Sequence, residues 1–215
     1  MSTPNTLPLS GKRVIILVGN DYEELELHYP KLRLMEAGAE VFIAGPEGQT
    51  VYEGKYGYPQ VSDIGISDLR VEDADALVIP GGWMPDKLRR DTNVLKFVKA
   101  MADANKPIAS ICHGPWIDIS AKIVEGVKYT STPAIKDDLM NAGARWGDKE
   151  VVVDLKHKRV SSRRPDDLPV FCHSLIALMI GNIPTPAPKS PADSNIVPSP
   201  EMPVKWPDEP PPTAD

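Results

Sequence analysis

The fold is decided by the stretch Pro107-Ile108-Ala109-Ser110-Ile111, which runs directly into Cys112-His113-Gly114-Pro115. The first five residues predict a buried strand, and Pro115 suits a first helical position because its missing N–H needs no partner there. A reactive residue between a strand and a helix is typical of a nucleophile elbow, here with cysteine in place of serine. Such a turn exposes the sulfur at the carboxyl edge of the sheet and points the helix N-terminus at it. We therefore expect Cys112 to be a nucleophile with a lowered thiol pKa.

The alternative for Cys112 is the role that free cysteines usually have, a buried and unreactive thiol. The elbow context favours the reactive interpretation. Cys172 lies in an apolar stretch between Phe171 and His173, and we interpret it as structural. Two cysteines cannot build a disulfide framework, and nothing else in the sequence indicates an oxidising compartment.

Strands and helices alternate along the rest of the chain. The sequence predicts strands at residues 14–18, 40–44, 76–79, 107–111, 151–153 and 160–162, and helices at 23–37, 92–104, 116–124, 135–142 and 168–180. A glycine-punctuated segment at 45–57 predicts a hairpin. The alternation predicts an α/β fold, in which a doubly wound, mostly parallel sheet carries helices on both faces.

Length and composition predict one domain with flanking segments. The chain has 215 residues, of which 41% are hydrophobic, enough for a single sizeable core. We expect a leader at residues 1–11, the α/β domain at 12–182 and a proline-rich tail at 183–215. Eleven prolines fall between Pro184 and Pro212. That composition favours extended, polyproline-like chain over a packed core.

Charge and motif spacing argue against several classes of partner. The net charge is −6, and the densest basic cluster, residues 156–164, is short and interrupted, which disfavours nucleic-acid binding. The apolar run at 14–18 is too short for a signal peptide or a membrane span, so we expect a cytoplasmic protein without a membrane partner. Four scattered histidines lack metal-ligand spacing, and we expect neither metal nor cofactor.

Two further segments are expected close to Cys112. Gly81-Gly82 follows a predicted strand, and their N–H groups, with that of His113, could form an oxyanion hole; an ordinary strand-ending turn explains them equally well. The acidic run at residues 21–26 follows the first strand. Its composition does not say which carboxylate turns inward.

Several short motifs of the sequence, taken in order, resemble the PfpI family of the ThiJ/PfpI superfamily over about residues 12–181. These motifs are Asp21-Tyr22-Glu23-Glu24-Leu25-Glu26-Leu27, Gly54-Lys55-Tyr56-Gly57, Pro80-Gly81-Gly82, Ala109-Ser110-Ile111-Cys112-His113-Gly114-Pro115, Ile135-Lys136-Asp137-Asp138 and Val160-Ser161-Ser162-Arg163. The resemblance implies a flavodoxin-like sandwich, related to that of class I glutamine amidotransferases, and assembly as a homo-oligomer, a dimer or a hexamer.

The resemblance also implies roles for individual residues. Glu23 would be the carboxyl beside Cys112, sharing a proton with it. His113 matches the catalytic histidine of the family, and Asp86, where archetypal members have Glu, would orient the histidine of an adjacent subunit. Thr132 stands where archetypal members have Tyr, in one wall of the pocket. Trp83 and Trp116 flank the motifs, and either line the pocket or pack in the ordinary way.

Several chemistries follow from the resemblance: peptide hydrolysis, glutathione-independent glyoxalase activity, deglycation and hydration. All need a thiolate that attacks an electrophilic carbon and a neighbour that moves a proton. We favour small carbonyl substrates, with Cys112 forming a hemithioacetal while Glu23 and His113 shuttle protons. A PfpI-type intracellular cysteine peptidase is the first alternative. The non-enzymatic alternative is a redox sensor or stress-protective protein, in which Cys112 is oxidised to a sulfinate.

A class I glutamine amidotransferase would share the elbow fold, but the sequence argues against it. Such an enzyme needs a histidine followed two residues later by an acid near the end of the domain. Here Arg159 stands two residues after His157, and Leu175 stands two after His173. Neither histidine fits.

Overall fold

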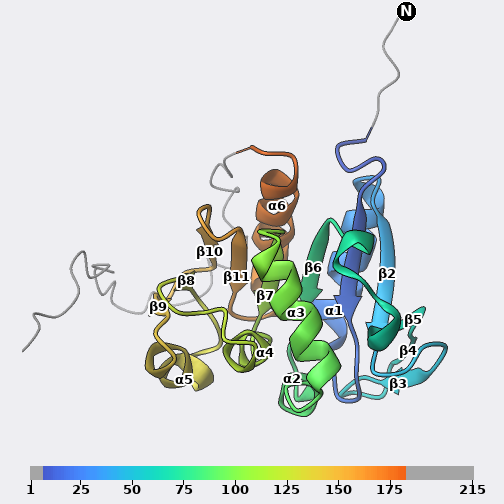
Figure 1. Cartoon of the computed structure of the whole chain (residues 1–215), viewed down its shortest axis with the longest axis horizontal. Coiled ribbons are helices and arrows are strands. Elements are labelled where there is room, and N and C mark those ends of the chain that lie inside the picture. The colour runs from blue at the N-terminus through green and yellow to red at the C-terminus, as the bar shows by residue number, and fades with distance from the viewer. Residues whose placement is uncertain (1–6, 183–215) are drawn as a thin grey trace, which may run out of the picture.

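The computed structural model describes residues 7–182, which form a seven-stranded sheet between layers of helices (Figure 1). The strand order is β10-β11-β7-β6-β1-β2-β5. These strands are β1 (Arg13–Leu17), β2 (Glu40–Gly45), β5 (Ile64–Gly65), β6 (Ala76–Ile79), β7 (Ile108–Ile111), β10 (Val151–Asp154) and β11 (Arg159–Ser162). Every neighbouring pair is parallel except β10 and β11. The predicted α/β fold with a mostly parallel sheet is confirmed.

Helices cover both faces of the sheet because the strands are added outward from β1 in two opposite directions. Toward β2 the connection is α1 (Glu24–Glu36), which packs against α6 (Leu168–Met179). On the other side of β1, the connection from β6 to β7 contains α3 (Thr92–Asp103), which packs against α4 (Pro115–Ser120). Right-handed crossovers in opposite directions place helices on opposite faces. The reversal also creates a switch point at the carboxyl ends of β1 and β6, where such folds bind ligands.

The central strands are buried on both faces, which explains their continuous apolar sequences. All four residues of β6 and of β7 are buried, as are the last four of β1. Packing starts before residue 12, because Leu9 is fully buried and its N–H donates to Ala37 O at 2.8 Å. The remainder of the expected leader, residues 1–6, and the proline-rich tail at 183–215 lie outside the described residues.

Several short elements lie at the carboxyl edge of the sheet. The predicted hairpin is formed by β3 (Val51–Glu53) and β4 (Pro59–Val61). A short parallel pair, β8 (Lys128–Tyr129) and β9 (Arg145–Trp146), lies beside α5 (Lys136–Asn141), and α2 (Met84–Leu88) follows β6. The sequence pattern did not predict β5, α2, β8 or β9, because elements of two to five residues are too short to show a period.

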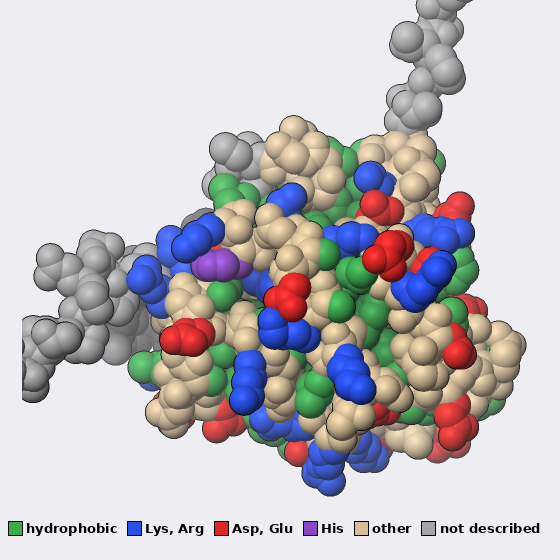
Figure 2. All heavy atoms as spheres, in the orientation of Figure 1, with side chains coloured by type: hydrophobic (Ala, Val, Ile, Leu, Met, Phe, Trp, Pro, Cys, Tyr) green, Lys and Arg blue, Asp and Glu red, His purple; other side chains and the backbone are tan. Residues whose placement is uncertain are grey.

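The helix predicted at 116–124 is shorter in the structure, where α4 ends at Ser120. Lys122 has a φ of 56°, and this left-handed conformation stops the helix. No helix in the described part of the chain combines the length and the hydropathy needed to cross a membrane. Figure 2 shows acidic and basic side chains interspersed over the face that α3 covers, with basic side chains gathered toward the lower edge, near α2.

Candidate active site

The candidate site lies at the carboxyl edge of the sheet, where Cys112 joins β7 to α4 as expected. Its φ of 60° is a left-handed conformation that residues with a side chain adopt rarely and often at functional sites. Backbone hydrogen bonds hold the turn from both sides. The Cys112 N–H donates to Ser162 O at 3.0 Å, and the Thr132 N–H donates to Cys112 O at 3.2 Å. Thr132 therefore supports the elbow through its backbone.

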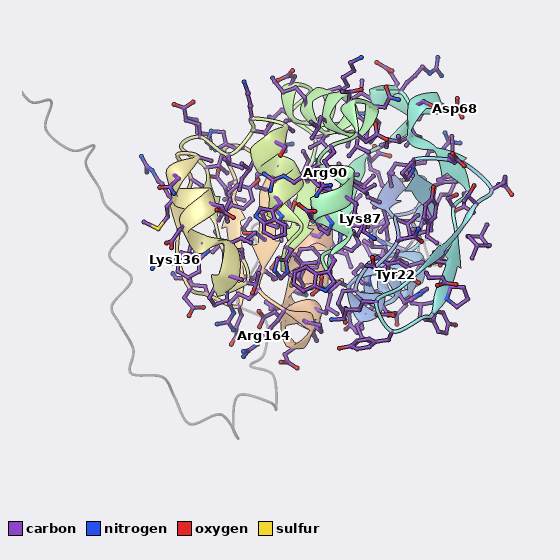
Figure 3. The ribbon with its side chains drawn as sticks, turned by 90° about the horizontal axis from the view of Figure 1, so that it is seen from below. Tyr22, Asp68, Lys87, Arg90, Lys136 and Arg164 are labelled. Atoms are coloured by element: carbon purple, nitrogen blue, oxygen red, sulfur yellow. The ribbon has the colours of Figure 1, made fainter. Side chains whose placement is uncertain are left out.

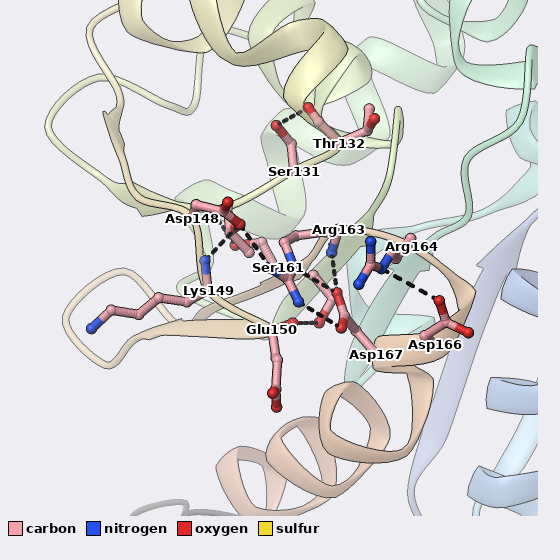
Figure 4. Close-up of polar contacts among 12 residues, drawn as sticks. Ser131, Thr132, Asp148, Lys149, Glu150, Ser161, Arg163, Arg164, Asp166 and Asp167 are labelled. Atoms are coloured by element: carbon pink, nitrogen blue, oxygen red, sulfur yellow. Dashed lines mark hydrogen bonds and ion pairs between the residues drawn. The ribbon is translucent and has the colours of Figure 1, made fainter. Parts of the chain in front are cut away.

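The end of β11 is fixed next to the elbow by an ion-pair network (Figure 4). Arg163 donates through Nε and Nη2 to the two carboxylate oxygens of Asp167, at 3.0 and 3.1 Å, and through Nη1 to Asp148 at 2.8 Å. Asp167 precedes α6, so the network ties this strand end to the last helix. The family-like motif at residues 160–163 thus has a structural function, because Ser162 O accepts the backbone N–H of Cys112.

Gly81 allows three segments to meet at the site. A Cβ atom at this position would lie 2.6 Å from Glu26 Oε2, 2.7 Å from Cys112 Cβ and 2.9 Å from His113 N. Real Cβ atoms do not approach other atoms so closely, so only glycine fits. The next residue, Gly82, has a φ of 77° and forms a β-bridge with Tyr22. The ends of β1, β6 and β7 are thereby brought into contact.

The carboxyl beside Cys112 belongs to Glu26 rather than to Glu23. Glu26 lies in the first turn of α1, is fully buried, and has its carboxyl close enough to Cys112 for its charge to raise the pKa of the thiol. Its Oε2 atom also accepts the Gly81 N–H at 2.8 Å. Burial, and then the charge of Glu23, raises the pKa of Glu26 to about 8. Glu26 therefore holds a proton at neutral pH, the property that the sequence analysis assigned to Glu23.

Glu23 has a different function, which explains the correction. It is the N-cap of α1, and its Oε2 accepts the Glu26 N–H at 2.8 Å. A capping side chain folds back onto its own helix. The side chain of Glu26, nearly one turn further along, is the one that reaches the elbow. Glu23 Oε1 lies 3.7 Å from Lys55 Nζ, so its charge is partly balanced.

The pKa of the Cys112 thiol is raised, whereas the sequence analysis predicted that it would be lowered. Burial is the largest cause, and the charge of Glu26 is the second. The backbone N–H groups of Gly82 and His113 are directed at the sulfur and favour the thiolate, but they do not outweigh burial. The raised pKa favours the thiol form of this sulfur at neutral pH.

The expected oxyanion hole changes for the same reason. Of the three amides proposed for it, that of Gly81 is occupied by the Glu26 carboxyl. Those of Gly82 and His113 face the sulfur of Cys112. Their part in an oxyanion hole stays a prediction.

The imidazole of His113 is a base in contact with the thiol. Its Nδ1 lies 3.2 Å from Cys112 Sγ. Burial, and then the positive charge of Lys55, lowers the pKa of His113, so the ring is neutral at pH 7 and able to accept a proton. The ring centroids of Trp83 and Trp116 lie 5.5 and 5.0 Å from that of His113. Both tryptophans thus border the site.

Within residues 7–182, Asp86 forms no hydrogen bond or ion pair with His113. It forms an ion pair at the surface with Arg90, which lies four residues further along the chain, just after the end of α2. Figure 3 views this edge from below and shows Lys87 and Arg90 on the α2 segment, between Tyr22 on one side and Lys136 on the other. The contact that we expect between Asp86 and an adjacent subunit stays a prediction.

Two site residues were missed by sequence reasoning. In the sequence, Glu26 was only one of several acids in the run at 21–26, and Lys55 was noted only as part of the family-like motif at residues 54–57. Lys55 comes from the turn between β3 and β4 and influences Glu23, Glu26 and His113 electrostatically. Within residues 7–182, no group of three or more histidine, cysteine or acidic side chains has the arrangement to hold a metal ion.

The fold and the site together define an α/β protein with a nucleophile elbow, in which the candidate nucleophile is a cysteine with a protonated carboxyl against its sulfur. Residues 12–178 match the DJ-1/PfpI family, and the chain belongs to it. The resemblance found in the sequence is thereby confirmed.

The curated relatives align over nearly their whole length. A protein named as a deglycase from Pyrococcus horikoshii is 44% identical over 167 residues, covering 78% of this chain and 99% of the relative. The putative cysteine protease YraA of Bacillus subtilis is 39% identical over 169 residues, covering 79% of this chain and 99% of the relative. Among solved structures, a two-domain protein from Anabaena variabilis with DJ-1/ThiJ/PfpI-like and ferritin-like domains has a TM-score of 0.75 and 36% identity, covering 80% of this chain and 48% of that one.

Proposed function

We propose that this protein is a cysteine-dependent enzyme that acts on small electrophilic carbonyls, in the manner of a glyoxalase III or a deglycase. The observation that carries the proposal is the buried Glu26 carboxyl beside Cys112, whose raised pKa of about 8 favours the protonated form at neutral pH. A nucleophile adds to a carbonyl most readily when an acid can protonate the oxygen at the same time. With the neutral imidazole of His113 on the sulfur, acid and base both contact the nucleophile.

With methylglyoxal as substrate, the first step is addition. The Cys112 thiol gives its proton to His113 Nδ1, and Sγ bonds to the aldehyde carbon. The carbonyl π electrons move to the oxygen, which takes the proton of Glu26. The product is a hemithioacetal, and Glu26 is now a carboxylate that can act as a base.

The second stage is an isomerisation followed by hydrolysis. Glu26 removes the hydrogen of the former aldehyde carbon and returns a proton to the neighbouring carbon, while His113 moves the hydroxyl protons. The aldehyde carbon is oxidised to a thioester and the ketone carbon is reduced to an alcohol, so no external oxidant is needed. One water then cleaves the C–S bond and releases lactate and the free thiol.

The relatives support this class of reaction, since several at 41–44% identity are named as deglycases. Deglycation also begins with attack on an electrophilic carbon of a sugar adduct. A cysteine peptidase is the second candidate, favoured by the name of the Bacillus subtilis relative and by the same thiol and imidazole pair. The two candidates differ in whether an amide bond is cleaved.

The first test is steady-state lactate formation from methylglyoxal by wild type and by Cys112→Ser, each also assayed on a casein substrate. Turnover of methylglyoxal that disappears in the serine variant supports the proposal. Cys112-dependent casein cleavage without lactate formation would establish the peptidase instead. Absence of both activities would overturn the proposal.

The redox-sensor alternative has one observation in its favour. The N–H groups of Gly82 and His113 and the Glu26 carboxyl all face the sulfur, where they would also bind the oxygens of a sulfinate. Mild peroxide followed by mass spectrometry tests it. A gain of two oxygens at Cys112, in a protein that turns over no carbonyl substrate, would favour the sensor.

A further inference from the structure

The imidazole of His113 contacts two indole rings that come from different elements. Trp83 immediately precedes α2, and its ring is tilted by 41° to the imidazole at 5.5 Å between centroids. Trp116 is the second residue of α4, and its ring is tilted by 52° at 5.0 Å. Tilted aromatic pairs at these separations are in attractive contact. Two ring contacts thus restrain the imidazole.

No carboxylate performs this task within the described chain. The hydrogen bond recorded for the His113 ring joins Nδ1 to Cys112 Sγ, and Nε2 has no hydrogen-bond partner among residues 7–182. Asp86, which we expect to orient the ring of an adjacent subunit, forms an ion pair with Arg90 of its own chain. A catalytic base usually depends on a third group to hold its orientation. We propose that Trp83 and Trp116 form an aromatic clamp that positions the imidazole of His113 toward the sulfur of Cys112.

The inner half of the clamp is itself rigidly held. Trp116 Nε1 donates to Asp138 Oδ2 at 2.7 Å, which ties the indole to α5. The guanidinium of Arg89 lies over the ring, 5.6 Å from its centroid. Arg89 is in turn fixed by a hydrogen bond from its Nε to Ser120 Oγ at 2.9 Å. Trp116 therefore presents a fixed wall to the imidazole, held through both its edge and its face.

The outer half, Trp83, is exposed over 60% of its surface, and its ring contact keeps water from the part of the imidazole that it covers. Exclusion of water disfavours the imidazolium and keeps Nδ1 available as an acceptor. The charged and titratable groups around His113 are Cys112 and Lys55, with Glu26 beyond the sulfur. Lys55 acts in the same direction as the clamp. The clamp thus sets both the orientation and the charge state of the base.

The test uses Trp83→Leu and Trp116→Leu, with Trp83→Phe and Trp116→Phe as matched controls that keep an aromatic ring. Two quantities are measured in the full chain: the rate at which iodoacetamide alkylates Cys112, located by mass spectrometry, and the pH titration of the His113 ring by NMR, assigned with His113→Gln. We expect both leucine variants to slow alkylation about tenfold and to move the His113 midpoint up toward its ordinary value. The phenylalanine variants should stay within about threefold of wild type.

Trp83→Leu is the decisive variant, because Trp83 is largely exposed and its loss should leave the fold intact. An unchanged alkylation rate and an unchanged His113 midpoint in this variant would overturn the clamp. Asp86→Asn provides the opposing test. If it moves the His113 midpoint as far as the leucine variants do, an acid from a neighbouring subunit orients the ring and the inference fails. The inference rests on the proposed function for its meaning, but alkylation and titration need no substrate, so the failure of carbonyl turnover would be seen separately.

Discussion

The buried carboxyl of Glu26 lies beside Cys112 and accepts the backbone N–H of Gly81 at 2.8 Å. One buried acid therefore joins α1, the end of β6 and the elbow after β7. The cost of burying it is reflected in its pKa of about 8. A protein that keeps such a group in its interior gives up stability there, and a proton-transfer role beside a nucleophile is a physical reason for retaining it.

The first prediction separates Glu26 from Glu23. Glu26→Gln keeps the shape of the side chain and an oxygen for the Gly81 N–H, but it has no proton to exchange. Lactate formation from methylglyoxal should fall by roughly 100-fold or more. In Glu23→Gln it should fall only a few-fold, with a stability loss of about 1 kcal/mol or less, because Glu23 acts as a helix cap. Equal losses of activity in the two variants would contradict the assignment.

The second prediction concerns stability and pH. Because the pKa of Glu26 is about 8 in the folded chain and near 4.5 when unfolded, the folded state binds more protons between these pH values. The free energy of unfolding should therefore fall as pH rises through this window, by on the order of 4 kcal/mol from this group alone. Glu26→Gln lacks the effect.

Urea unfolding at several pH values tests this prediction, with the difference between variant and wild type cancelling the other titrating groups. Relative to wild type, Glu26→Gln should gain stability steadily from pH 5 to pH 8. A difference that stays constant with pH would show that Glu26 titrates normally.

The sequence allowed the sheet and the elbow to be predicted because both have long or distinctive patterns. The apolar runs of β1, β6 and β7 are buried on both faces, and the transition from Ile111 through Pro115 marks the turn. The identity of the acid at the sulfur was not predictable in this way. Glu23 and Glu26 lie in the same acidic run, and the helix start that makes one a cap and turns the other inward is defined only by the folded backbone.

The third prediction tests the close approach at Gly81. Gly81→Ala would place a Cβ 2.6 Å from Glu26 Oε2 and 2.7 Å from Cys112 Cβ, so the acid and the thiol must move apart. Misplacement of reacting groups by a fraction of an ångström is costly, and we expect a loss of about tenfold or more in kcat/KM. Gly126→Ala is the control for loss of a glycine without a close contact, since its φ is positive, unlike that of Gly81, but no atom lies within 4 Å of its Cβ position. It should lose about 1 kcal/mol of stability and no activity. Wild-type activity in Gly81→Ala would refute the argument.

The last prediction concerns a buried network behind the elbow, which the sequence pattern did not reveal. Asp118, fully buried in α4, accepts hydrogen bonds from Ser110 Oγ at 2.6 Å and Tyr129 OH at 3.2 Å. The network ties α4 to β7 and β8 on either side of Cys112. Burial raises the pKa of Asp118 to about 6, with Arg159 and the two hydroxyls opposing the rise.

In Asp118→Ala, both hydroxyls lose their acceptor in a buried environment, and we expect the free energy of unfolding to fall by about 2–4 kcal/mol at pH 7. Asp118→Asn keeps an acceptor oxygen and should lose less. The measurement is urea unfolding at pH 7. An alanine variant as stable as wild type would show that the network contributes nothing to the free energy of unfolding.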